Sequence, residues 1–85
     1  MRVNHLAIAV RDSDAALAFF RRHFPVTMLT VRQPGHTGDY TWCDFFIGNF
    51  KLEIIQSAAA GSFVERFIEK RGEGLHHIAF EVENI

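Results

Sequence analysis

The chain has 85 residues, of which 48% are hydrophobic and 22% charged, and its formal net charge is −1. This is the composition of one small globular domain, and the charge balance excludes the basic surface of a nucleic-acid-binding protein. A chain of this length buries only about 60–65% of the surface that it exposes when unfolded, so it needs a further source of stability. Cys43 is the only cysteine, which excludes an internal disulfide, so we expect a bound metal or a partner subunit.

The sequence contains no segment long enough to be a membrane span. Its longest apolar run, Leu6 to Val10, is far too short to cross a bilayer. The run also makes a poor signal peptide, because His5 precedes it and the charged residues Arg11 and Asp12 follow it. We therefore expect a cytoplasmic protein without a membrane partner.

The first part of the chain predicts a strand, a helix and three further strands. Val3–Val10 is apolar and partly β-branched, which is typical of a strand. Asp12 or Ser13 can cap a helix whose apolar residues recur at helical spacing, and Pro25 ends that helix. We expect a second strand at Val26–Arg32, followed by a loop at 33–38. A hairpin follows, with strands at Tyr40–Ile47 and Phe50–Gln56.

The second part of the chain predicts one helix and one strand. Ser62 and Glu65 form an S-x-x-E capping box after a short linker, and Gly72 follows a cationic last turn. These signals predict a helix that begins near Ser62 and ends before Gly72. The segment Leu75–Val82 is apolar and predicts the last strand.

An internal repeat connects the first and the last strand. The run His-Leu-Ala-Ile-Ala-Val that begins at His5 recurs as His-Ile-Ala-Phe-Glu-Val from His77. Both copies begin with a histidine, which a strand does not require, so the second copy marks the start of a second module. We therefore expect an α+β fold, with a βαβββ module at 1–57. A linker helix and the first strand of an incomplete second module follow at 58–85.

Three side chains on these strands have metal-binding chemistry. Alternation along a strand places His5 and His77 beside small alanines, and Glu53 is a carboxylate in an otherwise apolar strand. Two imidazoles and a carboxylate suit a divalent ion such as zinc, cobalt, nickel, manganese or iron. The spacing is no zinc-finger pattern, and the alternative is a solvated Glu53 with two hydrogen-bonded histidines.

The sequence resembles methylmalonyl-CoA epimerases. More broadly, it resembles the vicinal oxygen chelate superfamily, which includes glyoxalases, extradiol dioxygenases and bleomycin-resistance proteins. The resemblance rests on Phe63–Val82, on His5–Val10 together with Asp12, and on 47–55, and it is weakest from 26 to 44. It implies a fold of paired βαβββ modules whose sheets curl around a metal ion.

The resemblance also implies a ligand set and a reaction. The ligands come from the first and fourth strands of each module, which here gives His5, Glu53 and, from the second module, His77. The fourth ligand, a glutamate of the family's last strand, has no counterpart before Ile85. The implied chemistry is metal-assisted enolisation of a carbonyl or thioester substrate, an acyl-CoA among the candidates, with a carboxylate removing the α-proton.

The sequence assigns no acid–base pair. Asp44, on the third strand, is a candidate base, although a solvated aspartate is the commoner interpretation of such a residue. His76 alternates with His77 along the strand, so we expect it on the opposite face, in a structural role. Four further residues are expected to be packed or exposed rather than functional: Cys43, Glu81, His23 and His36.

Three functions remain open at this point. The first is a metal-dependent epimerase or glyoxalase-type lyase that acts on a small molecule as a homodimer, in which His77 of one copy reaches His5 and Glu53 of the other. The second is a non-catalytic ligand-binding module. The third is a fragment of a longer glyoxalase or dioxygenase. Among the enzyme functions, an extradiol-dioxygenase-type iron site of two histidines and one carboxylate is the alternative to the epimerase.

Overall fold

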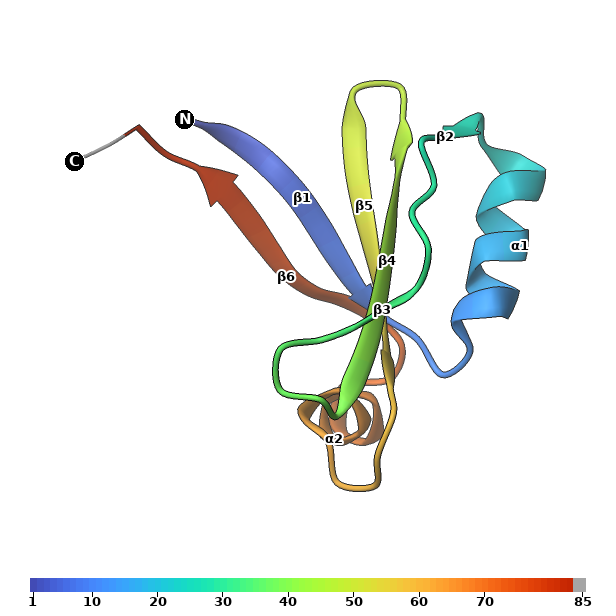
Figure 1. Cartoon of the computed structure of the whole chain (residues 1–85), viewed down its shortest axis with the longest axis vertical. Coiled ribbons are helices and arrows are strands. Elements are labelled where there is room, and N and C mark those ends of the chain that lie inside the picture. Colours follow the sequence, from blue (N-terminus) through green and yellow to red (C-terminus); the bar gives the residue numbers. More distant parts are fainter. Residues whose placement is uncertain (84–85) are drawn as a thin grey trace.

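The computed structural model describes residues 1–83 and combines two helices with a six-stranded sheet (Figure 1). The elements in chain order are β1 (Arg2–Ala9), α1 (Ser13–His23), β2 (Val26–Thr27), β3 (Gln33–Pro34), β4 (Tyr40–Ile47), β5 (Phe50–Ser57), α2 (Phe63–Arg71) and β6 (Gly74–Glu81). The strands follow the order β2-β4-β5-β1-β6, and β3 pairs with β4. The predicted α+β fold class is confirmed.

The second strand is shorter than the sequence predicted. Only Val26–Thr27 pairs with β4, whereas the strand was expected to continue to Arg32. Met28 has a left-handed φ of 55°, which interrupts an extended backbone and is uncommon for a residue with a side chain. Pairing with β4 resumes at Gln33–Pro34, inside the predicted loop, where a proline is tolerated because β3 lies at the sheet edge.

Helix α1 covers one face of the sheet. Its N-cap is Asp12, whose side-chain oxygen accepts hydrogen bonds from the backbone N–H of Asp14 and Ala15 at 3.0 and 3.1 Å. The helix ends at His23, before Pro25, as predicted. The buried core beneath it consists of Val10, Cys43, Phe45, Leu52 and Ile54, against which Leu17 and Phe20 pack. Burial raises the pKa of the Cys43 thiol, which acts here as a small packed hydrophobe, as expected.

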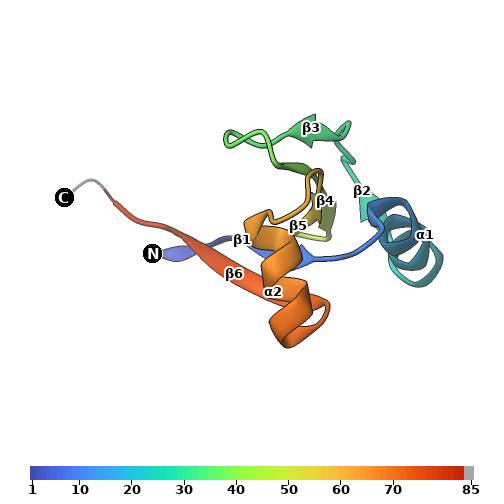
Figure 2. The same ribbon diagram turned by 90° about the horizontal axis from the view of Figure 1, so that it is seen from below.

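Helix α2 packs on the opposite face of the sheet, and only at one end. Its Val64 and Ile68 form a second buried cluster with Ala9 and Ile55. Figure 2 shows the two helices well apart, with β1 and β6 side by side. In this cluster β1 contributes only its last residue, Ala9. The candidate metal ligands His5, Glu53 and His77 belong to neither buried cluster.

The cap of α2 differs in one respect from the predicted capping box. Ser62 Oγ accepts a hydrogen bond from the N–H of Glu65 at 3.0 Å, as expected. The Glu65 carboxylate, however, accepts from the N–H of Gly61 at 3.0 Å, while the N–H of Ser62 donates to the carbonyl of Ala59. The Ser62 hydroxyl is buried and also lies 2.7 Å from that of Ser57.

Replacing Ser62 by alanine is expected to lower the free energy of unfolding by about 1–2 kcal/mol, because the N–H of Glu65 and the hydroxyl of Ser57 both lose a partner. Urea unfolding monitored by circular dichroism measures the loss. Ser62→Thr keeps the hydroxyl and is the control, expected to retain most of the stability. Equal stabilities of the alanine variant and the parent protein would show that the cap contributes nothing.

The two predicted units share one sheet. The strand of the second unit, β6, pairs with β1 of the first along its length. The division at residue 57 stays a prediction, and the last two residues of the second unit lie outside the described residues. Neither described helix is long and apolar enough to cross a membrane.

Candidate metal centre

The candidate centre surrounds Ala7, where three neighbouring strands meet. Ala7 is aligned with Glu53 on its parallel neighbour β5 and with His77 on its antiparallel neighbour β6. His5 precedes Ala7 by two positions and therefore lies on the same face. Ala7 is fully buried, and its small methyl group leaves the space above it to the three side chains.

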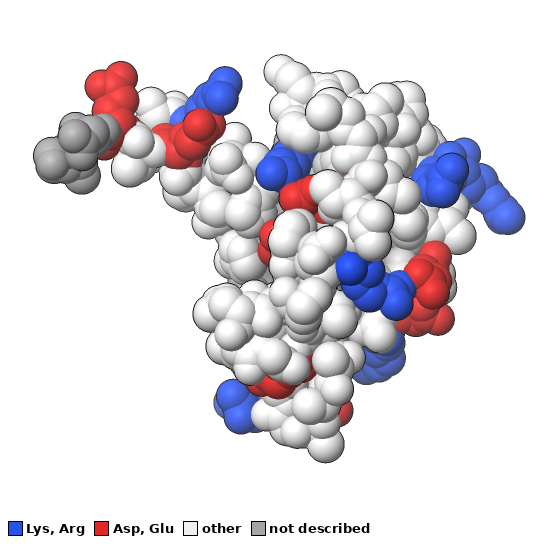
Figure 3. Space-filling model, viewed as in Figure 1, with Lys and Arg blue, Asp and Glu red and all other residues white. Residues whose placement is uncertain are grey.

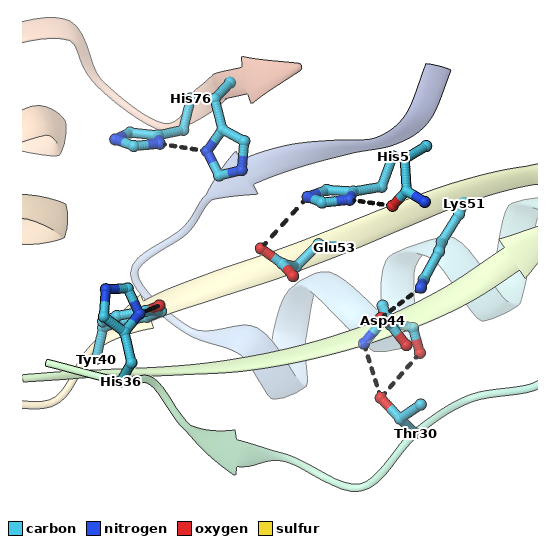
Figure 4. A network of polar contacts seen from close by, with 10 residues as sticks. His5, Thr30, His36, Tyr40, Asp44, Lys51, Glu53 and His76 are labelled. Carbon is cyan, nitrogen blue, oxygen red and sulfur yellow. Dashed lines mark hydrogen bonds and ion pairs between the residues drawn. The ribbon is translucent and has the colours of Figure 1, made fainter. Parts of the chain in front are cut away.

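The three residues present ligand atoms close to one another. One nitrogen or oxygen atom of each lies within 4.8 Å of those of the other two. His5 Nε2 is 4.0 Å from Glu53 Oε1 (Figure 4), and the rings of His5 and His77 meet edge to face with their centroids 5.5 Å apart. Two ligands that each lie about 2.0–2.2 Å from an ion are at most about 4.4 Å apart. Small side-chain rotations therefore suffice to bring all three around one ion.

The donor set and its burial also suit a metal ion. Two imidazoles with one carboxylate are the ligands of divalent first-row metals. The side chains of His5 and Glu53 are each 19% exposed, whereas His77, on the outer strand β6, is exposed. The centre is thus enclosed on the β5 side and open on the β6 side. Such an arrangement leaves room for further ligands or a substrate.

His76 lies on the same side of the sheet as His77, so the prediction that it points to the opposite face is wrong. The β1–β6 register passes from Ala7–His77 to Ile8–Leu75, which makes His76 the extra residue of a β-bulge. Its ring packs against Phe63 and Phe67 of α2, and its Nδ1 lies 2.8 Å from Nδ1 of His77. Burial, followed by the neighbouring His77, lowers the pKa of His76.

Asn4 is a second neighbour of the centre that the sequence reasoning missed. Its side-chain Oδ1 lies 2.8 Å from His5 Nδ1. Asn4 is also a bulge residue, because the register passes from Val3–Phe80 to His5–Ala79. A signal was present in the sequence: Asn4 directly precedes His5 as His76 directly precedes His77 in the internal repeat.

Asp44 is buried, so the prediction of a solvated aspartate is wrong. It is aligned with Glu53 across the β4–β5 pair and is only 7% exposed. Its carboxylate lies 3.4 Å from the ammonium group of Lys51, and its backbone is bonded to Thr30 (Figure 4). The ion pair compensates the cost of burying this charge next to a second carboxylate.

The remaining candidate residues lie at the surface, as predicted. Glu81 is exposed and forms an ion pair with Arg2 at 2.6 Å, which holds the pKa of the Glu81 carboxyl below its usual range. His23 and His36 are exposed, and the hydroxyl of Tyr40 lies 3.3 Å from His36 Nδ1. Glu81, His23 and His36 are not part of the group around Ala7.

A cleft of about 630 Å³ lies next to the centre. It separates the start of β1 from the tip of the β4–β5 hairpin, and Figure 3 shows the hollow between these two parts of the molecule. Asn4 and Lys51 line it, so it begins beside His5 and Glu53. A smaller hollow of about 490 Å³ lies beside α2. None of the three candidate ligands is among the lining residues of either hollow.

Comparison with protein families gives a match over nearly the whole chain. The profile of the glyoxalase/bleomycin resistance protein/dioxygenase superfamily matches residues 4–85. The ethylmalonyl-CoA/methylmalonyl-CoA epimerase of Cereibacter sphaeroides is 38% identical over 87 residues, which cover 99% of this chain and 63% of that protein. The mitochondrial methylmalonyl-CoA epimerase of Homo sapiens is 34% identical over 86 residues, which cover 99% of this chain and 48% of that protein.

A solved structure agrees with these relatives. A variant of the Streptomyces coelicolor methylmalonyl-CoA epimerase, in complex with 2-nitronate-propionyl-CoA, superposes with a TM-score of 0.79 at 27% identity. The match covers 100% of this chain and 64% of that chain. The chain thus spans 48% to 63% of the length of the two curated relatives.

Proposed function

Because the chain belongs to the glyoxalase/bleomycin resistance protein/dioxygenase superfamily, we propose that it provides the metal site of an isomerase of the methylmalonyl-CoA epimerase type. The observation that carries the proposal is the convergence of His5, Glu53 and His77 within 4.8 Å on one face of the sheet. The similarity to two epimerases that act on acyl-CoA substrates supports the choice of reaction.

In this proposal the three side chains hold one divalent ion. When bound, the ion supplies a Lewis acid that polarises a carbonyl oxygen and so makes the neighbouring C–H bond more acidic. The residues of the chain bind and orient the substrate around this point. Cobalt, zinc, nickel, manganese and iron all match the donor set, and the metal analysis of the purified protein identifies which one is bound.

The cleft beside the centre is the place that we assign to the substrate. Its wall carries the cations Arg2 and Lys51, which form ion pairs with the carboxylates of Glu81 and Asp44. An anionic acyl-CoA would compete with these carboxylates for the two cations. Asp44 is a buried carboxylate on the same face as the ligands, and its oxygen atoms are candidate acceptors of the α-proton. Lys51 holds that carboxylate in place at 3.4 Å.

We further propose that a second copy of the chain completes the site. Among residues 1–83, β6 has β1 as its only strand neighbour, which leaves its other edge open. Ile78 and Phe80 are 45% and 56% exposed, and alternation places both on one face of β6. Val82, which follows the strand, is 60% exposed. An open edge with apolar side chains beside it favours association with another strand. The second copy would then cover the open side of the centre beside His77, in the cytoplasmic location expected from the sequence. The three candidate ligands converge within one chain, so His77 does not have to reach His5 and Glu53 of a partner.

Exchange of the α-proton tests the proposed reaction. Methylmalonyl-CoA in D₂O is expected to incorporate deuterium at its α-carbon when the protein is loaded with a divalent ion, and at the background rate after chelation. Mass spectrometry of the thioester follows the incorporation. A hemithioacetal and, with ferrous iron, a catechol serve as comparison substrates for the glyoxalase and dioxygenase chemistries.

The three substrates separate the alternatives. Turnover of the hemithioacetal or the catechol alone would replace the epimerase assignment by the corresponding enzyme class. Metal binding without turnover of any substrate would favour the non-catalytic binding module. Absence of both metal binding and turnover would contradict the proposed function for this chain.

A further inference from the structure

The two β-bulges of the β1–β6 pair occupy equivalent places beside the two histidines. On β1 the extra residue is Asn4, which directly precedes His5, and on β6 it is His76, which directly precedes His77. The bulges lie on opposite strands of one antiparallel pair, at the start of the two copies of the internal repeat. Each of the two histidines is therefore directly preceded by a β-bulge residue.

Each bulge brings a hydrogen-bonding atom to the same ring nitrogen of its neighbour. Asn4 Oδ1 lies 2.8 Å from His5 Nδ1, and His76 Nδ1 lies 2.8 Å from His77 Nδ1. In a regular strand, the residue before a histidine points to the other face and cannot make this contact. The bulge changes that direction, and bulges commonly re-aim side chains next to active sites.

The contacts decide which nitrogen of each imidazole carries the proton. An amide oxygen is only an acceptor, so His5 must donate from Nδ1–H, which leaves Nε2 with a free lone pair. That nitrogen is the one that lies 4.0 Å from Glu53. In the second pair, the two Nδ1 atoms face each other. When His76 carries its proton on Nε2, its Nδ1 is an acceptor, and His77 then donates to it from its own Nδ1–H. A neutral imidazole binds a metal through its unprotonated nitrogen, and the hydrogen bond of the other nitrogen fixes which one that is.

We propose that Asn4 and His76 are positioning residues that hold His5 and His77 in the Nδ1–H tautomer, with Nε2 free to bind the ion. The inference rests on the metal site proposed above, but its first consequence is a property of the metal-free protein. His76 is itself held against Phe63 and Phe67 of α2. The bulge on β6 thus links the orientation of His77 to the packing of that helix.

The tautomers are measured by ¹⁵N-resolved NMR of the metal-free protein, at a pH where the histidines are neutral. We expect Nδ1–H for both His5 and His77 in the parent protein. Asn4→Ala is expected to release His5 into a mixture of tautomers, whereas Asn4→Asp keeps an acceptor oxygen and restores the single form. His76→Phe keeps a ring against α2 and removes the acceptor, so it is expected to release His77 without unfolding the helix.

The second readout is the affinity for Co²⁺, followed by titration calorimetry. Asn4→Ala and His76→Phe are each expected to weaken binding about 10–100-fold, while Asn4→Asp and the control Asn49→Ala, in the β4–β5 turn, stay within about threefold of the parent. Unchanged tautomers in Asn4→Ala and His76→Phe, or changed tautomers with unchanged affinity, would overturn the inference. If the parent binds neither Co²⁺ nor any of the other candidate divalent ions, the proposed function fails, and the tautomer measurement still decides whether the bulges orient the imidazoles.

Discussion

Glu53→Ala is expected to weaken the binding of a divalent ion by more than about 100-fold. Loss of a residue that only orients a ligand costs about 10–100-fold in metal affinity, so loss of a ligand costs more. Glu53 supplies the one carboxylate among the three converging side chains, and alanine removes both its oxygen atoms. Titration of the metal-free protein with Co²⁺ or Mn²⁺ measures the change.

Two matched variants make this result specific. Glu53→Gln keeps one oxygen ligand in the same place, so its affinity is expected to fall between those of the parent and the alanine variant. Glu69→Ala removes an exposed carboxylate from α2, away from the centre, and is expected to bind like the parent. Equal affinities of Glu53→Ala and the parent would remove Glu53 from the ligand set.

Phe45→Ala is expected to lower the free energy of unfolding by about 3–5 kcal/mol. Phe45 is fully buried beneath α1, where its ring lies 5.5 Å from that of Phe20. A protein of this size has a total stability of about 4–13 kcal/mol, so the substitution removes a large part of it. Urea unfolding of both proteins gives the difference.

The control for this experiment is another phenylalanine. Phe19, on α1, is 55% exposed, and Phe19→Ala is expected to change the stability much less, because the side chain already contacts water. A loss of less than about 1 kcal/mol for Phe45→Ala would contradict the assignment of Phe45 to the main core.

The elements that depend on local signals could be predicted from the sequence. Asp12 and Ser62 cap their helices through hydrogen bonds within the same turn, so their sequence neighbourhoods contain the information. The β4–β5 hairpin follows from two apolar runs around a short turn. The pairing of β1 with β6 was not predicted, because the internal repeat at His5 and His77 marked the two strands as equivalent and not as neighbours.

The errors arose where backbone irregularity decides the structure. The left-handed conformation of Met28 ended the second strand early, and nothing in its side chain signals such a conformation. The bulge at His76 reversed the face expected from strict alternation. Both features depend on how neighbouring strands fit together, which a single strand's pattern does not contain.

The structure brings His5, Glu53 and His77 to one place, and their role as metal ligands stays a prediction. The environment of Asp44, in contrast, was mispredicted. Asp44 is buried where the β4–β5 pair places it beside Lys51, and its backbone N–H donates to the hydroxyl of Thr30. Such pairing depends on the register between strands, and a register is set by the whole sheet rather than by the sequence around one residue.

Native mass spectrometry of the purified protein tests the central claim, because one spectrum reports both the number of copies and the bound metal. The account predicts a dimer that carries a divalent ion. It also predicts that His5→Ala, Glu53→Ala and His77→Ala each remove the ion. A protein that remains metal-free after incubation with each of the candidate divalent ions, whatever its number of copies, would contradict the account.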